Sequence, residues 1–276
     1  MNDQLEGVRS HYRATGLTER LKTALAVFGP EDQRLTPQQL AALDHFHTRG
    51  ITASADLAGL AGIAADMSVL DVGSGVGGLA RLLAATTGCR VTGVDLSEPF
   101  VEAARYLTER TGQGGQVKFE AASALALPFG DGAFDAVFLQ HVAMNIFDRP
   151  RFYREIRRVL REAGRFATYD VVSNGAELHY PVPWARTAAT SFLLSAAATR
   201  EAVEQAGFRT LVWQDDSETA KAWFERVRAS GPPPSPNLSV VMGPDFPALS
   251  ANLARNLGED RIGILTAVFE AASVSS

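Results

Sequence analysis

The sequence predicts an α/β fold with a doubly wound, mainly parallel sheet. Short apolar runs typical of buried strands alternate with segments whose apolar residues recur at helical spacing, and this alternation predicts parallel strands joined by helices. The run 69–72 is also followed by four glycines within positions 73–78, and an apolar helical pattern begins at Leu79. A strand, a tight turn and a helix make half of a βαβ unit.

Residues 1–64 precede that strand, and we predict that they form a helical lid. Apolar residues recur at helical spacing at positions 17, 21, 24, 25 and 28. A second helix is predicted over 36–47, with Thr36 as its N-cap and Gly50 as its C-terminal glycine. A third is predicted over 55–62. Helices that precede the first strand can fold over the carboxyl edge of such a sheet.

The middle of the chain predicts the rest of the sheet. Apolar runs bounded by turn residues predict further strands over 89–95, 116–121, 133–140, 165–171 and 208–213. Helices are predicted to begin at the Ser97 cap, to run from Asp148 to Gly164, and to run from Thr199 to Ala206. The weakly polar stretch 188–198 is interpreted as a buried or lid helix.

The C-terminal part predicts helices and one stiff linker. A helix is expected over 217–228, the proline-rich stretch 231–236 is expected to be extended, and 262–272 is interpreted as helix. We therefore expect three parts: an N-terminal lid (1–64), a core (65–215) whose loop 173–198 contributes to the substrate lid, and a C-terminal helical region (216–276) packed on the core.

Composition limits the class of protein. The net charge is -5, so a nucleic-acid partner is not expected, and a small molecule is the expected substrate. Cys89 is the single cysteine, which excludes an internal disulfide and suits the cytoplasm. No signal-peptide pattern and no apolar run of about 20 residues is present, so no membrane partner is expected. Monomer and homodimer both stay open.

The glycine-rich turn fits two ligand motifs. Gly73, Gly75 and Gly78 satisfy G-x-G-x-x-G, and Asp95 lies where a ribose-binding acid is expected, which favours a nicotinamide cofactor. Asp71, Gly73, Gly75 and Gly77 also fit D-x-G-x-G-x-G. The charge of Asp71 suits a cofactor with an ammonium and a sulfonium better than a pyrophosphate. This second pattern resembles the first motif of the class I S-adenosylmethionine (SAM) methyltransferases.

Further segments extend that resemblance. About residues 66–215 resemble the type 11 class I SAM methyltransferases. The segments that carry this resemblance are 127–129, 134–137 and 158–160. Segments 46–50, 140–146 and 180–185 resemble a bacterial branch grouped with sarcosine and dimethylglycine N-methyltransferases. The resemblance implies a Rossmann-like methyltransferase sheet. The family's usual seventh, antiparallel strand has no clear candidate.

The resemblance also implies the cofactor contacts. The backbone of Gly73 and Gly75 would follow the methionine and ribose, Asp95 would bind both ribose hydroxyls, and the Gln140 carbonyl would meet the ammonium. Adenine would pack on Leu96 and accept a hydrogen bond from the Ala124 backbone. Asp71 and Gly77 complete the motif, Ser123 stands where the family commonly has aspartate, and Arg49 is expected to bind a carboxylate of the cofactor or of the substrate.

Methyl-acceptor residues are predicted at the same edge. His141 follows the fourth strand, and an imidazole with a pKa of about 6.5 could act as general base. Asn145, Tyr180, Trp184 and Tyr12 are candidate substrate contacts, since aromatic rings line pockets for flat or cationic molecules. The histidines and the cysteine form no metal-ligand spacing, so no metal is expected.

Three functions stay open from the sequence. The first is methyl transfer from SAM, which yields S-adenosylhomocysteine, to a small molecule by in-line displacement, with an amine as the expected nucleophile and O-methylation of a natural product as the alternative. The second is an NAD(P)-dependent oxidoreductase. The third is a protein that binds SAM without catalysis.

Overall fold

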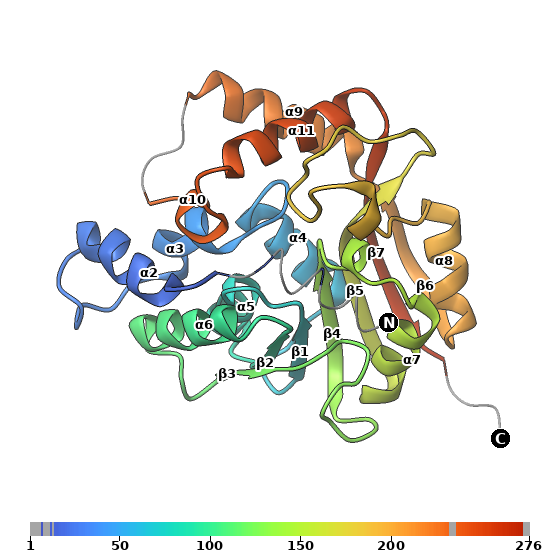
Figure 1. Ribbon diagram of the computed structural model, residues 1–276. Helices are drawn as coiled ribbons and strands as arrows, with labels where there is room; N and C mark the ends of the chain where they lie inside the picture. Colours follow the sequence, from blue (N-terminus) through green and yellow to red (C-terminus); the bar gives the residue numbers. More distant parts are fainter. Residues whose placement is uncertain (1–6, 8–11, 13, 232–235, 273–276) are drawn as a thin grey trace.

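A seven-stranded sheet in the order β3-β2-β1-β4-β5-β7-β6 forms the centre of the computed structural model, which describes residues 7, 12, 14–231 and 236–272 (Figure 1). The strands are β1 (Ser68–Val72), β2 (Arg90–Asp95), β3 (Val117–Ala121), β4 (Phe134–Gln140), β5 (Leu160–Ser173), β6 (Phe208–Asp215) and β7 (Ile262–Ala271). The first five strands run parallel, and β7 runs antiparallel to β5 and β6. The predicted doubly wound α/β class is confirmed.

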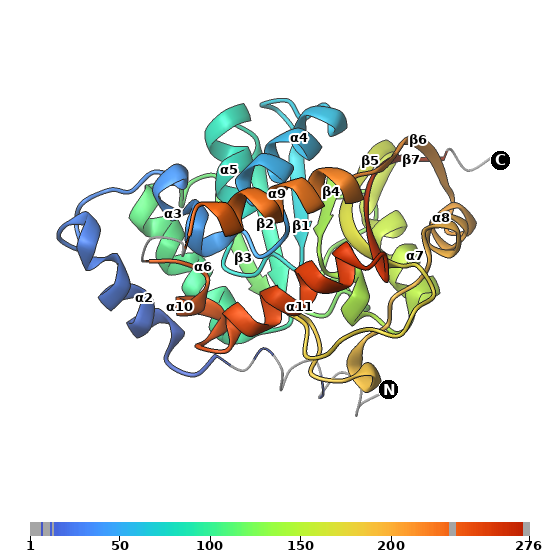
Figure 2. The same ribbon diagram turned by 90° about the horizontal axis from the view of Figure 1, so that it is seen from above.

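Helices cover both faces of the sheet (Figure 2). They are α2 (Leu17–Leu25), α3 (Pro37–Asp44), α4 (Ile51–Ala61), α5 (Gly78–Thr87), α6 (Glu98–Thr111), α7 (Arg149–Val159), α8 (Ala196–Gln205), α9 (Ser217–Ala229), α10 (Ser239–Met242) and α11 (Phe246–Gly258). Side chains of α4, α5 and α6 pack on one face, and those of α7 and α8 pack on the other. The binding edge of such a sheet lies at the carboxyl ends of its strands.

The elements before β1 meet the C-terminal region at that edge. Leu21 and Leu25 of α2, Leu40 of α3, Leu107 of α6 and Val241 of α10 belong to one buried cluster. Residues far apart in the sequence therefore share a core beside the carboxyl ends of the strands, where a lid would lie.

The predicted N-cap at Thr36 is confirmed, whereas Gly50 has another role. The Thr36 hydroxyl accepts a hydrogen bond from the Gln39 backbone, and the Gln39 side chain bonds back, which is a capping box. α3 ends at Asp44, so 45–50 is a loop rather than helix. Gly50 is the N-cap of α4, with φ of 52°.

The segment 262–272, interpreted from the sequence as helix, is the strand β7, and this corrects the prediction. Nine of its ten residues are buried, because it lies between β5 and β6 inside the sheet. A strand buried on both faces is a continuous apolar run without alternation. Hydrophobic periodicity does not distinguish such a strand from a buried helix. The described part of the C-terminal region, 216–231 and 236–272, therefore completes the sheet as well as adding helices.

Two boundaries in the middle of the chain also differ from the prediction. α7 ends at Val159 and β5 begins at the next residue, so Gly164 lies within the strand. The stretch 188–198 is not one helix: a 3₁₀ turn (Ala188–Thr190) is followed by an extended segment before α8. Most of the predicted linker, 232–235, lies outside the described residues.

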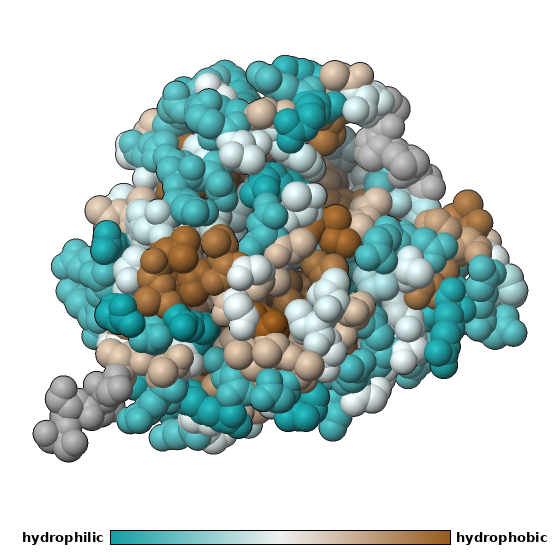
Figure 3. Space-filling model, turned by 180° about the vertical axis from the view of Figure 1, so that it is seen from behind, coloured by the Kyte–Doolittle hydropathy of each residue, from teal (hydrophilic) through white to brown (hydrophobic). Residues whose placement is uncertain are grey.

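The surface seen from behind is mainly hydrophilic, with apolar residues in several places (Figure 3). Large exposed hydrophobic side chains are dispersed over separate elements: Val27, Leu60 and Val227. Among the described residues, no helix combines the length and apolar character that a membrane crossing requires.

Candidate active site

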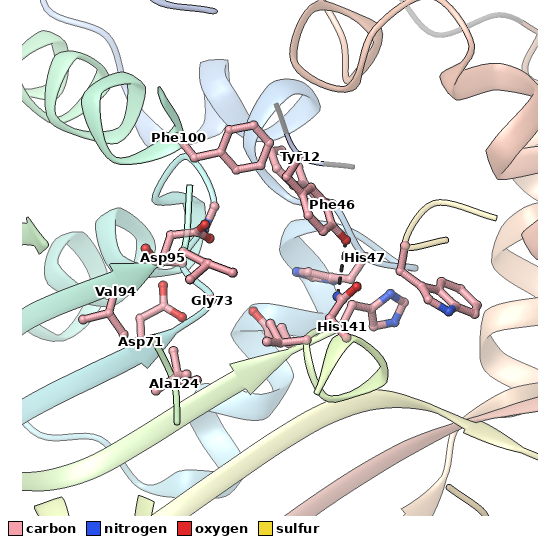
Figure 4. Close-up of a pocket in the computed structure, with 18 of the residues that line it drawn as sticks. Tyr12, Phe46, His47, Asp71, Gly73, Val94, Asp95, Phe100, Ala124 and His141 are labelled. Carbon is pink, nitrogen blue, oxygen red and sulfur yellow. Dashed lines mark hydrogen bonds between the residues drawn. The ribbon is translucent and has the colours of Figure 1, made fainter. Parts of the chain in front are cut away.

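A cavity at the carboxyl ends of β1, β2 and β4 brings together most of the predicted site residues (Figure 4). It holds about 1230 Å³ of empty space, including its opening to solvent. The predicted residues that line it are Tyr12, Asp71, Gly73, Gly75, Asp95, Leu96, Ser123, Ala124, Gln140, His141, Asn145 and Trp184. Gly77, Arg49 and Tyr180 are not among its lining residues.

The turn after β1 has the backbone geometry that a close ligand needs. Gly73 and Gly75 have positive φ values of 74° and 53°. A Cβ on Gly73 would lie 2.3 Å from the Val142 side chain, and one on Gly75 would lie 3.2 Å from the Phe46 ring. A side chain at Gly73 would collide with Val142, and one at Gly75 would crowd the Phe46 ring, so this part of the cavity wall favours glycine.

Gly77, predicted as a cofactor residue, lies in the same turn but does not line the cavity. Its φ is 85°, and a Cβ there would lie 2.4 Å from the Phe119 ring and 2.8 Å from Arg81. The glycine leaves room at the start of α5 for the Phe119 ring of β3 and for the Arg81 side chain of α5 itself.

Two carboxylates lie at the carboxyl ends of neighbouring strands: Asp71 is buried near the end of β1, and Asp95 is half-buried as the last residue of β2. The Oδ2 atom of Asp95 accepts the Gly75 N–H at 2.9 Å, and its Oδ1 accepts the Ser97 N–H at 2.9 Å. Asp71 is 3% exposed, and its Oδ2 is buried with no hydrogen-bond partner among the described residues. Burial, with Asp95 as the second cause, raises the pKa of Asp71 to about 7. A cationic ligand group beside it would relieve both effects.

The segments after β2 and β3 form the neighbouring wall. Leu96 follows β2 and Ser123 and Ala124 follow β3, and all three predicted adenine contacts line the cavity. The Ser123 hydroxyl accepts the Leu125 N–H at 3.2 Å, so it also holds its own turn.

His141 lies directly after β4 in a strained backbone conformation, with φ of 52°. Its N–H donates to the Tyr169 carbonyl at 2.9 Å, and its ring stacks on the Tyr169 ring. The Nε2 atom is buried and has no partner in the described part of the chain. Burial, and then His47, lowers the pKa of His141 well below its usual value, which favours an uncharged ring at neutral pH.

Sequence reasoning missed a polar cluster beside His141. The Ser54 hydroxyl lies 3.1 Å from Nδ1 of His45, 3.2 Å from Nε2 of His47, and donates to Oε1 of Gln140 at 2.9 Å. Burial lowers the pKa of both His45 and His47 to about 3, with Arg81 and His45 as the respective second causes. The two histidines of the H-F-H run at 45–47 were the sequence feature that could have indicated this cluster. No local sequence feature marks Ser54 as a member of it.

Asn145 joins the strand ends to the N-terminal segment. Its Nδ2 donates to the Tyr12 hydroxyl at 3.3 Å, which Figure 4 marks as a dashed line. The Tyr12 carbonyl accepts the Ser97 hydroxyl at 3.2 Å, and its ring meets Phe100 edge-on. Tyr12 therefore spans the cavity from the Asp95 side to the His141 side.

Two predicted residues have structural roles elsewhere. Arg49 pairs with Asp56 and lies 3.6 Å from Asp216, so it links α4 to the start of α9. Tyr180 packs against the main core cluster, whereas Pro183 and Trp184 from the same loop line the cavity. Within the described residues, no group of His, Cys, Asp and Glu has the arrangement of a metal site.

Residues 70–168 match the family model of a methyltransferase domain. The chain is 40% identical over 109 residues to sterol 24-C-methyltransferase ERG6B of Gibberella zeae, covering 40% of this chain and 29% of that protein. It is 39% identical over 113 residues to methyltransferase GfsG of Streptomyces halstedii, covering 41% of each. The glycine/sarcosine/dimethylglycine N-methyltransferase of Actinopolyspora halophila is 31% identical over 172 residues, covering 62% of this chain and 30% of that protein. These matches span less than half of each relative.

Solved structures agree on the fold. A geranyl diphosphate methyltransferase in complex with GPP and sinefungin has a TM-score of 0.73 and 16% identity, covering 98% of this chain and all of that one. The [4+2]-cyclase SpnF has a TM-score of 0.67 and 21% identity, covering 88% and 99%. Residues 70–168 of this chain therefore match a methyltransferase domain, and the sheet has the fold of these solved structures.

Proposed function

We propose that this protein is a SAM-dependent methyltransferase that methylates a neutral hydroxyl group of a small, largely apolar molecule. The observation that carries the proposal is one cavity with two unlike halves. One half has the acids and glycines of a cofactor site, and the other has an unpaired imidazole nitrogen among apolar side chains.

The residues of the first half fit the cofactor. Asp71 offers an unpaired buried carboxylate oxygen to an ammonium, and Asp95 has two oxygens that suit a ribose diol. Gly73 and Gly75 line this half of the cavity, and their positive φ values are ones that residues with a side chain rarely adopt. When bound, SAM supplies an electrophilic methyl group on a positively charged sulfur, and the sulfur leaves as a neutral sulfide.

The second half would orient the nucleophile and take its proton. Nε2 of His141 is buried and unpaired in the described part of the chain, so it can accept a hydrogen bond from a hydroxyl and then its proton. Phe46, Met144 and Trp184 keep this half apolar, which excludes water during the reaction. A hydroxyl enters this buried half uncharged, whereas an alkyl amine must first lose a proton, and for this reason we place a hydroxyl ahead of the amine expected from the sequence.

An amine nucleophile is the second candidate. The similarity to the Actinopolyspora halophila N-methyltransferase, which extends over 62% of this chain, favours it. An alkyl amine must lose a proton before it attacks, so activity would rise steadily with pH toward the amine pKa of about 10. With a hydroxyl acceptor, activity would stay level between about pH 6 and 9, because His141 is already neutral.

The test is calorimetry with SAM and NADH, followed by transfer of a labelled methyl group to panels of hydroxylated and amino compounds. We expect SAM to bind and NADH not to bind, with label appearing on hydroxyl compounds. NADH binding in place of SAM would overturn the proposal in favour of an oxidoreductase. SAM binding without transfer to either panel would favour a non-catalytic SAM-binding protein, a distinction the fold leaves open because a cyclase shares it.

A further inference from the structure

We infer that the methyl acceptor carries two hydrogen-bond donors, one that meets His141 and is methylated, and a second that meets the side-chain oxygen of Asn145. The ligand class that fits is a flat aromatic molecule with two hydroxyl groups. This inference rests on the proposed function and specifies its substrate.

Asn145 uses only half of its amide within the protein. Its Nδ2 donates to the Tyr12 hydroxyl, whereas its Oδ1 is buried without a partner among the described residues. The residue is 9% exposed and lines the cavity. A buried carbonyl oxygen without a donor costs free energy, and a ligand that donates to it recovers that cost.

The turn that carries Asn145 is held firmly, so the oxygen keeps its place. The Asn145 N–H donates to the Val142 carbonyl at 2.9 Å, and the Ala143 N–H donates to Oδ2 of the buried Asp170 at 2.8 Å. The Met144 carbonyl accepts the Phe192 N–H at 2.8 Å. Such a turn presents an acceptor that is already oriented before the ligand arrives.

His141 supplies the second acceptor on the same loop. In the tautomer with its hydrogen on Nδ1, Nε2 of His141 accepts a hydrogen bond, and this atom too is buried without a partner in the described structure. Two unpaired acceptors, four positions apart and lining one cavity, are satisfied together by a ligand with two donors.

The surrounding wall favours a flat ring. Trp184 is 3% exposed, and its Nε1–H already donates to the Ser191 hydroxyl at 2.9 Å, so it offers the ligand its apolar ring. Phe46 and Ile146 line the same cavity. Aromatic and apolar walls suit an aromatic body, while the two acceptors fix its hydroxyl edge.

The arrangement predicts strong selection against an acceptor that lacks the second hydroxyl. Such a molecule would leave Oδ1 of Asn145 unpaired inside a site that excludes water. Sites built to bond a ligand hydroxyl reject the analogue without it far more strongly than apolar pockets distinguish methylene groups. We expect a preference of at least about tenfold.

Calorimetry on the full chain saturated with S-adenosylhomocysteine tests this, with 2,3-dihydroxynaphthalene and 2-naphthol as probes. The dihydroxy probe should bind at least about tenfold more tightly. Asn145→Leu should abolish the preference. Tyr12→Phe removes the same hydrogen bond from Asn145 but leaves Oδ1 in place, so it should keep the preference, as should the exposed control Asn174→Leu.

The outcomes separate the two proposals. If S-adenosylhomocysteine does not bind the wild-type protein, the proposed function fails. If it binds but the two probes bind equally, or neither binds, the two-donor inference is wrong while the proposed function stands. An Asn145→Leu variant that binds S-adenosylhomocysteine normally and keeps the preference would also overturn the inference.

Discussion

The ring of His141 lies nearly parallel to the ring of Tyr169, with centroids 5.5 Å apart and an interplanar angle of 12°. The Tyr169 hydroxyl lies 2.7 Å from the Thr48 hydroxyl, and the His47 ring meets both rings edge-on. His141 is therefore held between a strand and the loop before α4, which fixes where its nitrogen points.

Replacing His141 tests its role as general base. We expect His141→Asn to lower turnover by about 10²- to 10⁴-fold while SAM affinity changes little, because the ring serves the acceptor. Steady-state kinetics and calorimetry measure the two effects separately. Since burial lowers the pKa of His141, the wild-type profile should show no ionisation of this ring near neutrality. Nearly full turnover in the variant would leave alignment and water exclusion as the catalytic contributions.

Replacing Asp95 tests the cofactor site. Asp95→Ala removes the acceptor of the Gly75 and Ser97 N–H groups and the proposed ribose partner, each charge-assisted hydrogen bond being worth about 1.5 to 3 kcal/mol. SAM affinity should fall at least about tenfold. Calorimetry on a variant whose circular dichroism matches the wild type checks this, and unchanged affinity would show that the cofactor assignment is wrong.

Asp71 predicts how SAM binding depends on pH. Its pKa of about 7 in the unliganded protein means that much of it is protonated in mildly acidic solution, and binding an ammonium requires the charged form. SAM affinity should therefore rise as the pH increases through about 7 and level off above it, with proton release on binding below that pH.

The raised pKa of Asp71 changes the stability of the folded protein in the opposite direction, so that stability falls as the pH rises. Because the folded pKa is raised above the unfolded value of about 3.9, its stabilising contribution is full below that value and is lost as the pH rises through about 7.

Asp71→Asn should abolish the pH dependence of SAM affinity near neutrality. Calorimetry at several pH values in buffers of different ionisation enthalpy measures both the affinity and the proton release, and a flat wild-type profile would contradict the prediction.

The pair Arg81–Asp44 predicts a large stability effect. Nη2 of Arg81 donates to Oδ2 of Asp44 at 2.8 Å, and both side chains are at most 1% exposed. Arg81→Leu leaves the acid buried without its partner and should cost about 3 to 5 kcal/mol of unfolding free energy. Urea denaturation measures this, and the double variant Arg81→Leu/Asp44→Leu should lose less than the single one. Equal losses would show that the cost is one of packing.

Local sequence pattern was sufficient to predict several of the residues that line the cavity. The turn after β1 places Gly73 and Gly75, and the ends of parallel strands place Asp95 and Gln140 at one edge, so these residues could be predicted before the fold was known. Ser54 could not, because its partners come from a loop and a strand that only the tertiary structure brings to it.

Arg49 and β7 show the opposite limitation. An arginine after a lid helix suggests an anion site, yet its partners Asp56 and Asp216 neutralise it outside the cavity. The apolar run of β7 fits a buried strand and a buried helix equally well. It forms a strand because it pairs with β5 and β6, which are distant in sequence.

The contact between Tyr12 and Asn145 predicts that the elements before β1 respond to the cofactor. Tyr12 bonds to Ser97 on one side of the cavity and to Asn145 on the other, so exchange of a ligand beneath it requires these bonds to open. Hydrogen exchange of α2 and α3 should slow when S-adenosylhomocysteine binds, because a lid has low local stability until its ligand is present. Tyr12→Phe keeps the ring against Phe100 but loses the hydroxyl, so the protection should be smaller in this variant. The exchange of the α8 amides, which lie at the far edge of the sheet, serves as the internal control and should not change. Equal exchange of α2 and α3 with and without ligand in the wild type would show that these helices are a fixed wall of the cavity.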